Sequence, residues 1–389
     1  MRIALVNYVH APQLTTPESL IASYETLRGV AGALSREVGR DGQVRVFQGF
    51  TSSAIDDRGA AVWEFVRCPH SSSAKGLTLR QAVNERVAAW MPDVVHLNGL
   101  LFAYAAADLR RHLPRWAALL LQHHAEPPPR SRLKRWVFRA ALAGVDGFSF
   151  SGLGLCDEWR AAGLIRERQL VFEIMEGSTA FRPGDREEAR RRSGLDGEPC
   201  LLWVGRFDRN KDPITVLAGF EKVVKGRPGA RLHMVYADDT LGGAVQSFIA
   251  QRPGLESRVT LLGHRPHDWL EHAFRAADVF VSGSHREGSG YAATEAIACG
   301  AVPVLTDIES FRFLTGGAAF GALWKPGEAE DLVRALSEVL SQSLASHRER
   351  GRVHFDAKLS FAAIARDAIR AYSHCTRHRE SSLRTARRA

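Results

Sequence analysis

Residues 200–224 read CLLWVGRFDRNKDPITVLAGFEKVV, and this stretch contains one complete unit of the expected fold. An apolar run ends at Gly205, as a buried strand would, and a helical pattern of apolar residues follows Lys211. Between them, Asp212 is a good helix N-cap and Pro213 a good first helical residue. The stretch therefore predicts a strand, a short turn and a helix.

The same order of a short apolar run and a longer helical pattern recurs on both sides of this stretch. In the first half, strands are predicted at 2–7, 43–49, 94–97, 117–122, 147–150 and 169–174, with helices at 17–37, 78–89 and 131–143. In the second half, further strands are predicted at 231–235, 259–262, 279–282 and 302–306, with helices at 186–193, 241–252, 269–277, 292–299 and 329–341. Strands that alternate with helices in this way predict parallel sheets of βαβ units.

The chain of 389 residues is long enough for two such domains, and we expect an α/β protein of two doubly wound, Rossmann-like domains facing across a cleft. The predicted domains are residues 1–182 and 183–355, with the break at the sequence RPGD (182–185). A helix within 356–376 is expected to cross back to the first domain, and the basic tail 377–389 is predicted to be disordered. Ligands of doubly wound sheets bind at the carboxyl ends of the strands, so the site is expected in loops that follow strands.

The composition is that of an ordinary globular protein, with 45% hydrophobic and 24% charged residues, which argues against a disordered or fibrous chain. The five cysteines are scattered without a Cys-x-x-Cys pair, so neither a disulfide framework nor a cysteine zinc site is predicted. No apolar run approaches the roughly 20 residues that span a membrane. We expect a cytoplasmic protein, with peripheral attachment at the inner face of the membrane left open.

The net charge of +9 is concentrated in two places. The tail 377–389 holds five arginines and one glutamate. The second cluster interleaves cations with apolar residues and comprises Arg130, Arg132, Leu133, Lys134, Arg135, Trp136, Val137, Phe138 and Arg139. This cluster is either a solvated helix face or a docking face for anionic lipid headgroups. Nucleic acid is not an expected partner, because no helix-turn-helix, zinc-finger or RNP motif is present.

Two carboxylates mark the segment HREGSGYAATE (285–295), which follows one predicted strand and opens the next helix. Glu287 lies in the loop and Glu295 about one turn into the helix, while Gly288 and Gly290 between them allow close backbone approach. Backbone N–H groups at a helix start suit an anion or hydroxyl oxygens, and carboxylates accept hydrogen bonds from sugar hydroxyls. The alternative is an ordinary helix N-terminus whose glutamates favour the helix dipole.

Two cations, Arg206 and Lys211, flank the strand-to-helix turn at the carboxyl edge of the second sheet. Arginine binds phosphate as a planar fork and lysine as a point charge, so the two could clamp a diphosphate. The alternative is a pair of solvated surface cations.

Three histidines lie at or directly after the ends of predicted strands in the first domain. His123 and His124 follow the strand 117–122, and His96 lies near the end of the strand 94–97. A histidine pair can bind a metal, but no third ligand has convincing spacing, and either residue could be a hydrogen-bonded loop histidine. His96 is as readily structural as functional.

With these segments in this order, the chain resembles the retaining nucleotide-sugar glycosyltransferases of family 4, which have the two-domain GT-B architecture. The matching motifs are VGRFDRNK (204–211), LGH (262–264), ADVFV (277–281) and the segment 287–304, in which seven residues separate Glu287 from Glu295. Weaker matches are PDVVH (92–96) and the histidine pair. The resemblance covers most of the chain and is specific within 201–331.

The resemblance implies a role for each candidate residue. Arg206 and Lys211 would hold the donor diphosphate, Glu287 would contact the donor sugar and Glu295 the ribose hydroxyls. The loop residues Gly288, Ser289, Gly290 and Tyr291 would line the substrate, with the N–H groups of the last two facing its oxygens. The segment around His264 would border the nucleobase, and His124, or else His123, would lie beside the donor sugar.

The expected function is therefore transfer of a sugar, with retention, from a UDP- or GDP-type donor to a hydroxyl acceptor, which could be a glycan, a lipid-linked molecule or a small molecule. The resemblance implies no metal and no cofactor. Three departures keep a non-catalytic nucleotide-sugar-binding subunit open as an alternative. The loop 8–16 lacks the usual Gly-Gly pair, the segment 236–240 (YADDT) replaces a glycine-rich turn, and Ser289 replaces an aromatic residue.

Overall fold

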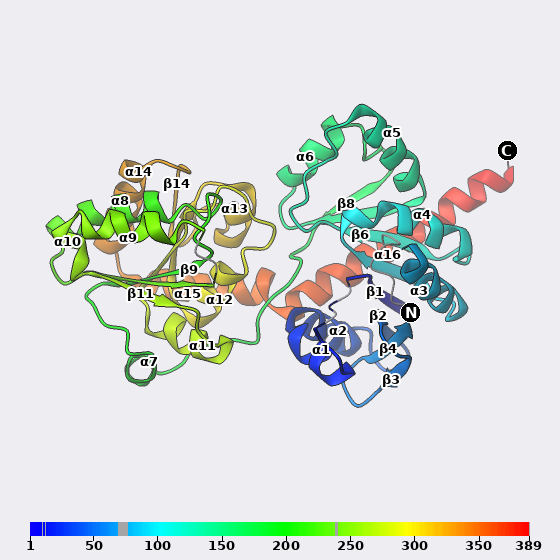
Figure 1. The fold of residues 1–389 in the computed structure, drawn as a ribbon. Helices are drawn as coiled ribbons and strands as arrows, with labels where there is room; N and C mark the ends of the chain where they lie inside the picture. The colour runs from blue at the N-terminus through cyan, green and yellow to red at the C-terminus, as the bar shows by residue number, and fades with distance from the viewer. Residues whose placement is uncertain (10, 12, 69–76, 238–239, 389) are drawn as a thin grey trace. The chain divides into compact units, whose positions relative to one another are not determined.

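The computed structural model describes residues 1–9, 11, 13–68, 77–237 and 240–388 (Figure 1). The chain divides into two compact units, of which the first combines Met1–Ser178 with Ser360–Ala389 and the second is Thr179–Leu359. The boundary between Ser178 and Thr179 thus lies shortly before the predicted break at 182/183. His10, Pro12 and the pair Asp238-Asp239, which belong to two of the departures noted above, lie outside the described residues.

The first unit contains an eight-stranded sheet in the order β3-β4-β2-β1-β5-β6-β7-β8, in which every neighbouring pair is parallel except β3 and β4. Its strands are β1 Arg2–Asn7, β2 Gln43–Phe50, β3 Ala54–Asp56, β4 Val62–Arg67, β5 Val94–Asn98, β6 Ala118–Gln122, β7 Gly147–Phe150 and β8 Leu170–Glu173. Its helices are α1 Pro17–Ser23, α2 Glu25–Glu37, α3 Leu77–Ala89, α4 Ala103–His112, α5 Arg132–Ala141, α6 Gly154–Ala161 and α16 Phe361–Arg388.

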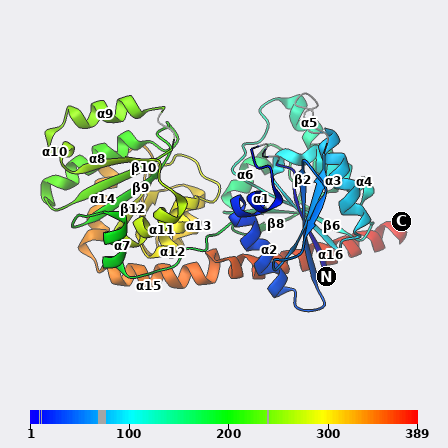
Figure 2. The same cartoon turned by 60° about the horizontal axis from the view of Figure 1, so that its bottom comes forward.

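Helices cover both faces of this sheet, with α3 and α4 on one side and α2 and α16 on the other (Figures 1 and 2). The central strands β1, β5 and β6 are consequently mostly apolar, and every residue of β6 is buried. The strand order reverses between β1 and β5, so the loops after these two strands flank the switch point of the sheet.

The long helix α16 belongs to the first unit, as predicted for the C-terminal helix. Its first residue, Phe361, packs on α2 at Gly29, where a Cβ atom would lie 2.2 Å from the ring, so only glycine admits this contact. Further along, the Tyr372 hydroxyl lies 2.6 Å from Nδ1 of the buried His96 on β5. His96 therefore serves to attach α16, and burial lowers its pKa to about 3, which keeps the ring neutral.

The predicted disorder of the tail is corrected by the structure for residues 377–388, which continue α16. No glycine or proline interrupts the chain from 361 to 388. Arg379 also anchors the extension, because its Nε donates to the Arg115 carbonyl at 2.9 Å and its guanidinium lies 3.5 Å from Asp146.

The second unit contains a six-stranded parallel sheet in the order β11-β10-β9-β12-β13-β14. Its strands are β9 Cys200–Gly205, β10 Arg231–Tyr236, β11 Val259–Gly263, β12 Val279–Val281, β13 Val302–Thr306 and β14 Ala322–Trp324. Its helices are α7 Arg186–Ser193, α8 Pro213–Gly226, α9 Gly242–Ala250, α10 Pro253–Glu256, α11 His267–Ala276, α12 Tyr291–Cys299, α13 Glu309–Thr315, α14 Ala329–Ser341 and α15 Leu344–His354.

Two helix layers enclose this sheet, with α8, α9, α10 and α14 on one face and α7, α11, α12 and α15 on the other (Figure 2). The two doubly wound units confirm the predicted fold class. The strand order reverses between β9 and β12, which pair in parallel at the centre of the sheet. The loops after these two strands therefore flank the switch point, where open α/β sheets bind ligands. Among the described residues, no helix combines the length and apolar character that crossing a bilayer requires.

Candidate functional site

The loops after β9 and β12 are bound together at the switch point of the second unit. Asn210 makes most of the connection: its Nδ2 donates to the Arg286 carbonyl at 3.0 Å, its Oδ1 accepts from the Arg286 N–H at 3.1 Å, and its carbonyl accepts from the His285 N–H at 2.8 Å. Gly283 allows this approach, because a Cβ there would lie 2.9 Å from the Asp212 carbonyl oxygen. The two loops thus form one rigid rim.

Lys211 and Glu287, predicted from separate segments, form an ion pair across this rim. Both side chains are mostly buried, with 21% and 14% of their surface exposed. Lys211 is positioned by Asp208, whose carboxylate accepts from its backbone N–H at 2.8 Å. Asp212 caps α8 by accepting from the Thr215 N–H at 3.2 Å, as the sequence predicted. The structure therefore places a cation and a carboxylate at the carboxyl ends of the two central strands.

Arg206 lies on the same loop, directly after β9, and 59% of its side chain is exposed. Its guanidinium lies 3.1 Å from the Asp208 carboxylate, which also holds the backbone of Lys211. Asp208 was not among the predicted site residues, and it connects the two predicted cations.

The helix α12 begins at Tyr291, one residue before the predicted start at 292. Gly288, Ser289 and Gly290 are buried, and Gly290 is the N-cap, with a left-handed φ of 60°. A Cβ on Gly290 would lie 2.6 Å from the Phe311 ring, so both backbone and space require glycine. Tyr291 opens the helix with 44% of its side chain exposed. The helix dipole favours an anion at this end.

Glu295 lies on the second turn of α12 and is bound by a histidine that the sequence did not single out. Nε2 of His267 donates to Oε1 of Glu295 at 2.8 Å, and the ring of His267 stacks on Phe181 with centroids 4.7 Å apart. Only 13% of the Glu295 side chain is exposed. His264, the predicted nucleobase neighbour, is exposed in the short loop between β11 and α11.

In the first unit, the two consecutive histidines after β6 have different environments. His123 is buried; its Nε2–H donates to the Glu126 carbonyl at 3.0 Å and its Nδ1 accepts from the Ala125 N–H at 3.3 Å. Burial lowers its pKa, consistent with a neutral ring. Since both ring nitrogens of His123 bind the loop, this residue serves the local fold.

His124 keeps 34% of its side chain exposed and pairs through Nδ1 with the buried Glu176 carboxylate at 3.1 Å. Burial opposes a charge on this ring, but the hydrogen bond and negative charge of Glu176, with the charge of Glu126, raise its pKa above the usual value. Glu126 also fixes the backbone, because Oε2 accepts from the His124 N–H at 2.6 Å and Oε1 from the Leu100 N–H at 3.1 Å. His124 is thus a positioned, readily protonated side chain at the carboxyl edge of the sheet.

Sequence reasoning missed the groups that hold the predicted residues: Glu126, Glu176, Asp208, Asn210 and His267. Glu176 follows β8 at the same carboxyl edge as His124, and Asp208 and Asn210 lie inside the quoted loop. Their positions after strands were a usable signal, but their pairings depend on side-chain packing.

Part of the sequence is similar to known proteins. Residues 185–352 match the family of group 1 glycosyl transferases. The D-inositol 3-phosphate glycosyltransferase of Segniliparus rotundus is 31% identical over 187 residues, which cover 46% of this chain and 42% of that protein. The enzyme of the same name from Nocardia farcinica is 30% identical over 218 residues, covering 54% and 48%. The chain thus matches less than half the length of these curated relatives.

Solved structures resemble nearly the whole chain. Sucrose-phosphate synthase from Thermosynechococcus elongatus aligns with a TM-score of 0.71 and 21% identity over 96% of this chain and 98% of that one. Anabaena Alr3699/HepE, solved in complex with UDP and glucose, aligns with a TM-score of 0.70 and 15% identity over 96% and 100%. These likenesses confirm the predicted GT-B fold of two Rossmann-like units with a returning helix. Residues 185–352, which include Arg206, Lys211, Glu287 and Glu295, are thus similar to the group 1 glycosyl transferases.

Proposed function

We propose that the chain is a retaining glycosyltransferase that moves a sugar from a nucleoside-diphosphate sugar to a hydroxyl acceptor. The observation that carries the proposal is the Lys211–Glu287 pair at the switch point of a family-matched unit. A donor of this kind presents a diphosphate, for which cations are suited, and sugar hydroxyls, for which carboxylates are suited. UDP in the structurally similar Anabaena protein supports this donor class.

Catalysis in this proposal is electrostatic. As the bond to the anomeric carbon breaks, negative charge grows on the leaving diphosphate, and Lys211, Arg206 and the N-terminus of α12 stabilise it. Because these groups supply positive charge from the protein, the reaction is proposed to need no metal ion. Glu287 holds the sugar hydroxyls, and the acceptor oxygen attacks from the side of the leaving group, so configuration is retained.

His124 is proposed to serve the same reaction from the first unit. The charge of Glu176 favours its protonated form, in which Nε2–H can donate to a substrate oxygen while Nδ1–H donates to Glu176. The acceptor is proposed to be a hydroxyl-bearing glycan, lipid-linked molecule or small molecule.

The second candidate function is a non-catalytic subunit that binds nucleotide sugars. The observation that favours it is the loop 8–16 after β1, which lacks glycine. Such a subunit would bind the donor through the second unit and release no nucleoside diphosphate.

A thermal-shift screen against UDP, GDP and their sugars tests the proposed donor class. A nucleotide held at 100 times its dissociation constant is expected to add about 2.7 kcal/mol to the stability of the folded state. Slow release of nucleoside diphosphate from the stabilising sugar would support catalysis, and stabilisation without any turnover would favour the binding subunit. Absence of stabilisation by every nucleotide would contradict both.

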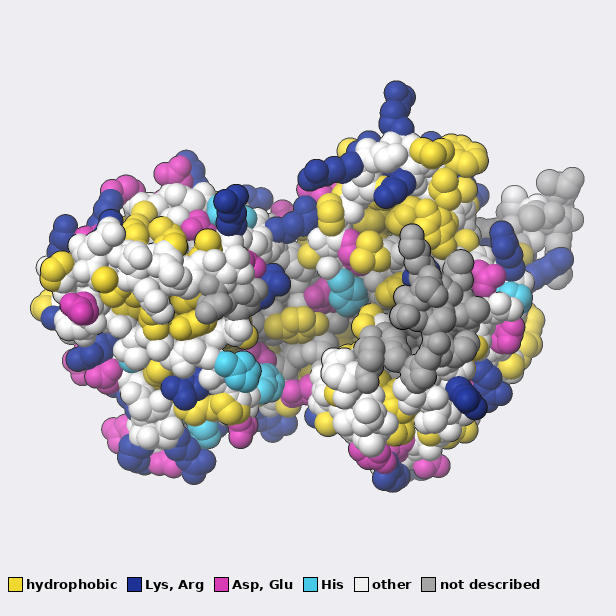
Figure 3. All heavy atoms as spheres, in the orientation of Figure 1, with side chains coloured by type: hydrophobic (Ala, Val, Ile, Leu, Met, Phe, Trp, Pro, Cys, Tyr) yellow, Lys and Arg dark blue, Asp and Glu magenta, His cyan; other side chains and the backbone are white. Residues whose placement is uncertain are grey.

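We also propose an anionic membrane surface as a partner of the first unit. Large apolar side chains on α5, at the start of α4 and in the 3-10 turn before α4 are exposed: 72% of Leu133, 69% of Trp136, 41% of Tyr104 and 59% of Leu101. Figure 3 shows hydrophobic side chains gathered over α5 with lysine and arginine side chains around them. Phe138 instead is buried and packs edge-on against Tyr104 at 5.1 Å.

Charge and exposure at α5 together favour a membrane over a solvated face. The Trp136 side chain is exposed. If the cations of α5 were only a solvated face, we would expect this tryptophan to pack inward. The cations of the cluster 130–139 contribute about 1 kcal/mol each near an anionic surface, enough for reversible attachment. Exposed tryptophan and leucine suit the boundary between headgroups and acyl chains.

Flotation with phosphatidylserine-containing vesicles at low salt is the corresponding test. The wild type is expected to float with these vesicles, to remain behind with neutral ones, and to be released as salt rises. Lys134→Glu and Trp136→Ser should each weaken flotation, whereas Lys225→Glu, the same charge change on α8, should not. Wild-type protein that stays in the soluble fraction on anionic vesicles would refute the proposal.

A further inference from the structure

Glu295 is held by a chain of contacts that begins at the first residues of the second unit. Phe181 is 8% exposed, packs near Phe274 with centroids 6.3 Å apart, and presents its ring to His267. The two rings are nearly parallel, 28° apart. The ring of His267, held on one face, donates from Nε2 to Oε1 of Glu295 at 2.8 Å.

We propose that His267 is a positioning residue that fixes the carboxylate of Glu295 for the ribose hydroxyls of the donor. The proposal rests on the proposed function, which gives Glu295 the ribose. What the structure adds is that the orientation of this carboxylate is set by an imidazole from another helix, α11, and not by α12 alone.

The local backbone explains why His267 reaches Glu295. β11 ends at Gly263, which has a left-handed φ of 66°, and Pro266 is the N-cap of α11 with an extended ψ of 150°. His267 is therefore the first residue of α11, and the start of this helix packs beside α12. The cap sets the direction in which the His267 side chain leaves the helix, and the stacking on Phe181 together with the hydrogen bond to Glu295 holds the half-exposed ring in place.

A fixed carboxylate has a chemical consequence for diol recognition. A carboxylate has about four lone-pair sites on two oxygens, so one hydrogen bond from His267 leaves acceptor sites for two neighbouring hydroxyls. A glutamate that is already ordered also loses less rotamer freedom on binding. Removing that order is expected to weaken binding about 2- to 10-fold. Affinity should fall for nucleotides whose ribose hydroxyls Glu295 binds.

The experiment measures discrimination between ribose and deoxyribose. UDP, GDP, 2′-deoxy-UDP and 2′-deoxy-GDP are titrated calorimetrically into the wild type, His267→Ala, His267→Gln and Glu295→Gln. In His267→Ala the affinity for the ribonucleotide should fall about 2- to 10-fold and that for the deoxynucleotide much less, so the preference for ribose shrinks. His267→Gln, which retains an N–H donor, should restore part of the preference. His267→Ala added to Glu295→Gln should cause little further loss.

A control and three opposing outcomes complete the test. His272→Ala, a substitution elsewhere on α11, should change neither affinity. Equal losses for both nucleotides in His267→Ala would make the residue merely structural, and unchanged affinities would leave it without a role. Tighter ribonucleotide binding would mean that His267 blocks Glu295. If the wild type binds some nucleotides and shows any of these outcomes, the positioning role alone fails; if it binds none of the four, the proposed function fails with it.

Discussion

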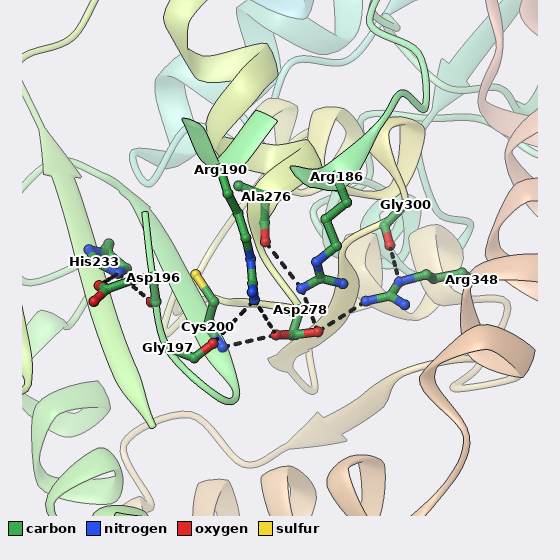
Figure 4. Close-up of polar contacts among 10 residues, drawn as sticks. All are labelled: Arg186, Arg190, Asp196, Gly197, Cys200, His233, Ala276, Asp278, Gly300 and Arg348. Atoms are coloured by element: carbon green, nitrogen blue, oxygen red, sulfur yellow. Dashed lines mark hydrogen bonds and ion pairs between the residues drawn. The ribbon is translucent and has the colours of Figure 1, made fainter. Parts of the chain in front are cut away.

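Replacement of Asp278 by alanine is expected to destabilise the second unit by about 3 kcal/mol, because this carboxylate pairs with three arginines at once. Oδ1 lies 2.5 Å from Arg186 and 3.1 Å from Arg348, and Oδ2 lies 3.4 Å from Arg190 (Figure 4). The Cys200 N–H also donates to Oδ2 at 3.0 Å. Asp278 thus connects α7, α15, β9 and the start of β12.

The expected loss has two physical sources. The side chain of Asp278 is 15% exposed and those of the arginines about a third, so the guanidinium groups that remain after its removal repel one another with limited solvent screening. The buried Cys200 N–H also loses its acceptor, which costs about 1–3 kcal/mol by itself. Each arginine retains a backbone carbonyl, of Ala276, Gly197 or Gly300, so the cluster loosens without releasing them.

Scanning calorimetry of Asp278→Ala and its controls measures this loss. A 3 kcal/mol loss should lower the transition of a unit of this size by about 6–12 °C. Asp278→Asn keeps an acceptor for Cys200 but no charge, so its transition temperature should lie between those of the wild type and Asp278→Ala. Arg348→Ala should lower the transition less than Asp278→Ala does, because Asp278 still pairs with two arginines. A shift below 2 °C for the alanine variant would show that the cluster contributes little.

The fold was largely predictable because most strands are short apolar runs that end in turns. β1, β7, β9 and β13 have the predicted bounds, and the central strands are buried on both faces. β4 was not predicted because Glu64 interrupts its apolar pattern; in the fold this buried carboxylate pairs with Arg45 and Arg86 at 2.7 and 2.6 Å. A pairing of that kind is invisible until distant segments meet.

Other differences come from very local geometry. The predicted helix 17–37 is two helices, α1 and α2, joined at Tyr24, whose ψ of 52° is not helical, and neither glycine nor proline marks that position. β14 has three residues, too few for a pattern. Asp278 was recognised only as part of a family motif, because its three arginines come from residues 186, 190 and 348.

In the candidate site, too, some residues could be predicted from the sequence and others could not. Lys211 and Glu287 were predictable because each follows a central strand, and the topology then brings the loops together. Their supports Asp208 and Asn210 were not, and neither was His267 beside Glu295, because these residues act through particular side-chain hydrogen bonds that composition and periodicity do not encode.

Lys211→Ala is expected to lower the rate of nucleoside-diphosphate release from the donor sugar about 10²–10³-fold. The ammonium group is mostly buried, so its charge acts on the leaving diphosphate with little screening. Its removal also leaves Glu287 without the cation that balances it, and the unpaired carboxylate then repels the diphosphate. Lys222→Ala, which removes an exposed lysine paired with Glu330, is the matched control and should leave the rate unchanged.

A double-mutant cycle separates loss of charge stabilisation from general damage to the site. Glu287→Gln alone should lower the rate, because its carboxylate holds the sugar hydroxyls. In the Lys211→Ala background the same change should cost less, or raise the rate, because it removes the repulsion. Initial rates at saturating donor, with the thermal transition of each variant as the folding check, give the coupling between the two residues. Strictly additive effects, or a Lys211→Ala rate within threefold of wild type, would place the chemistry elsewhere in the protein.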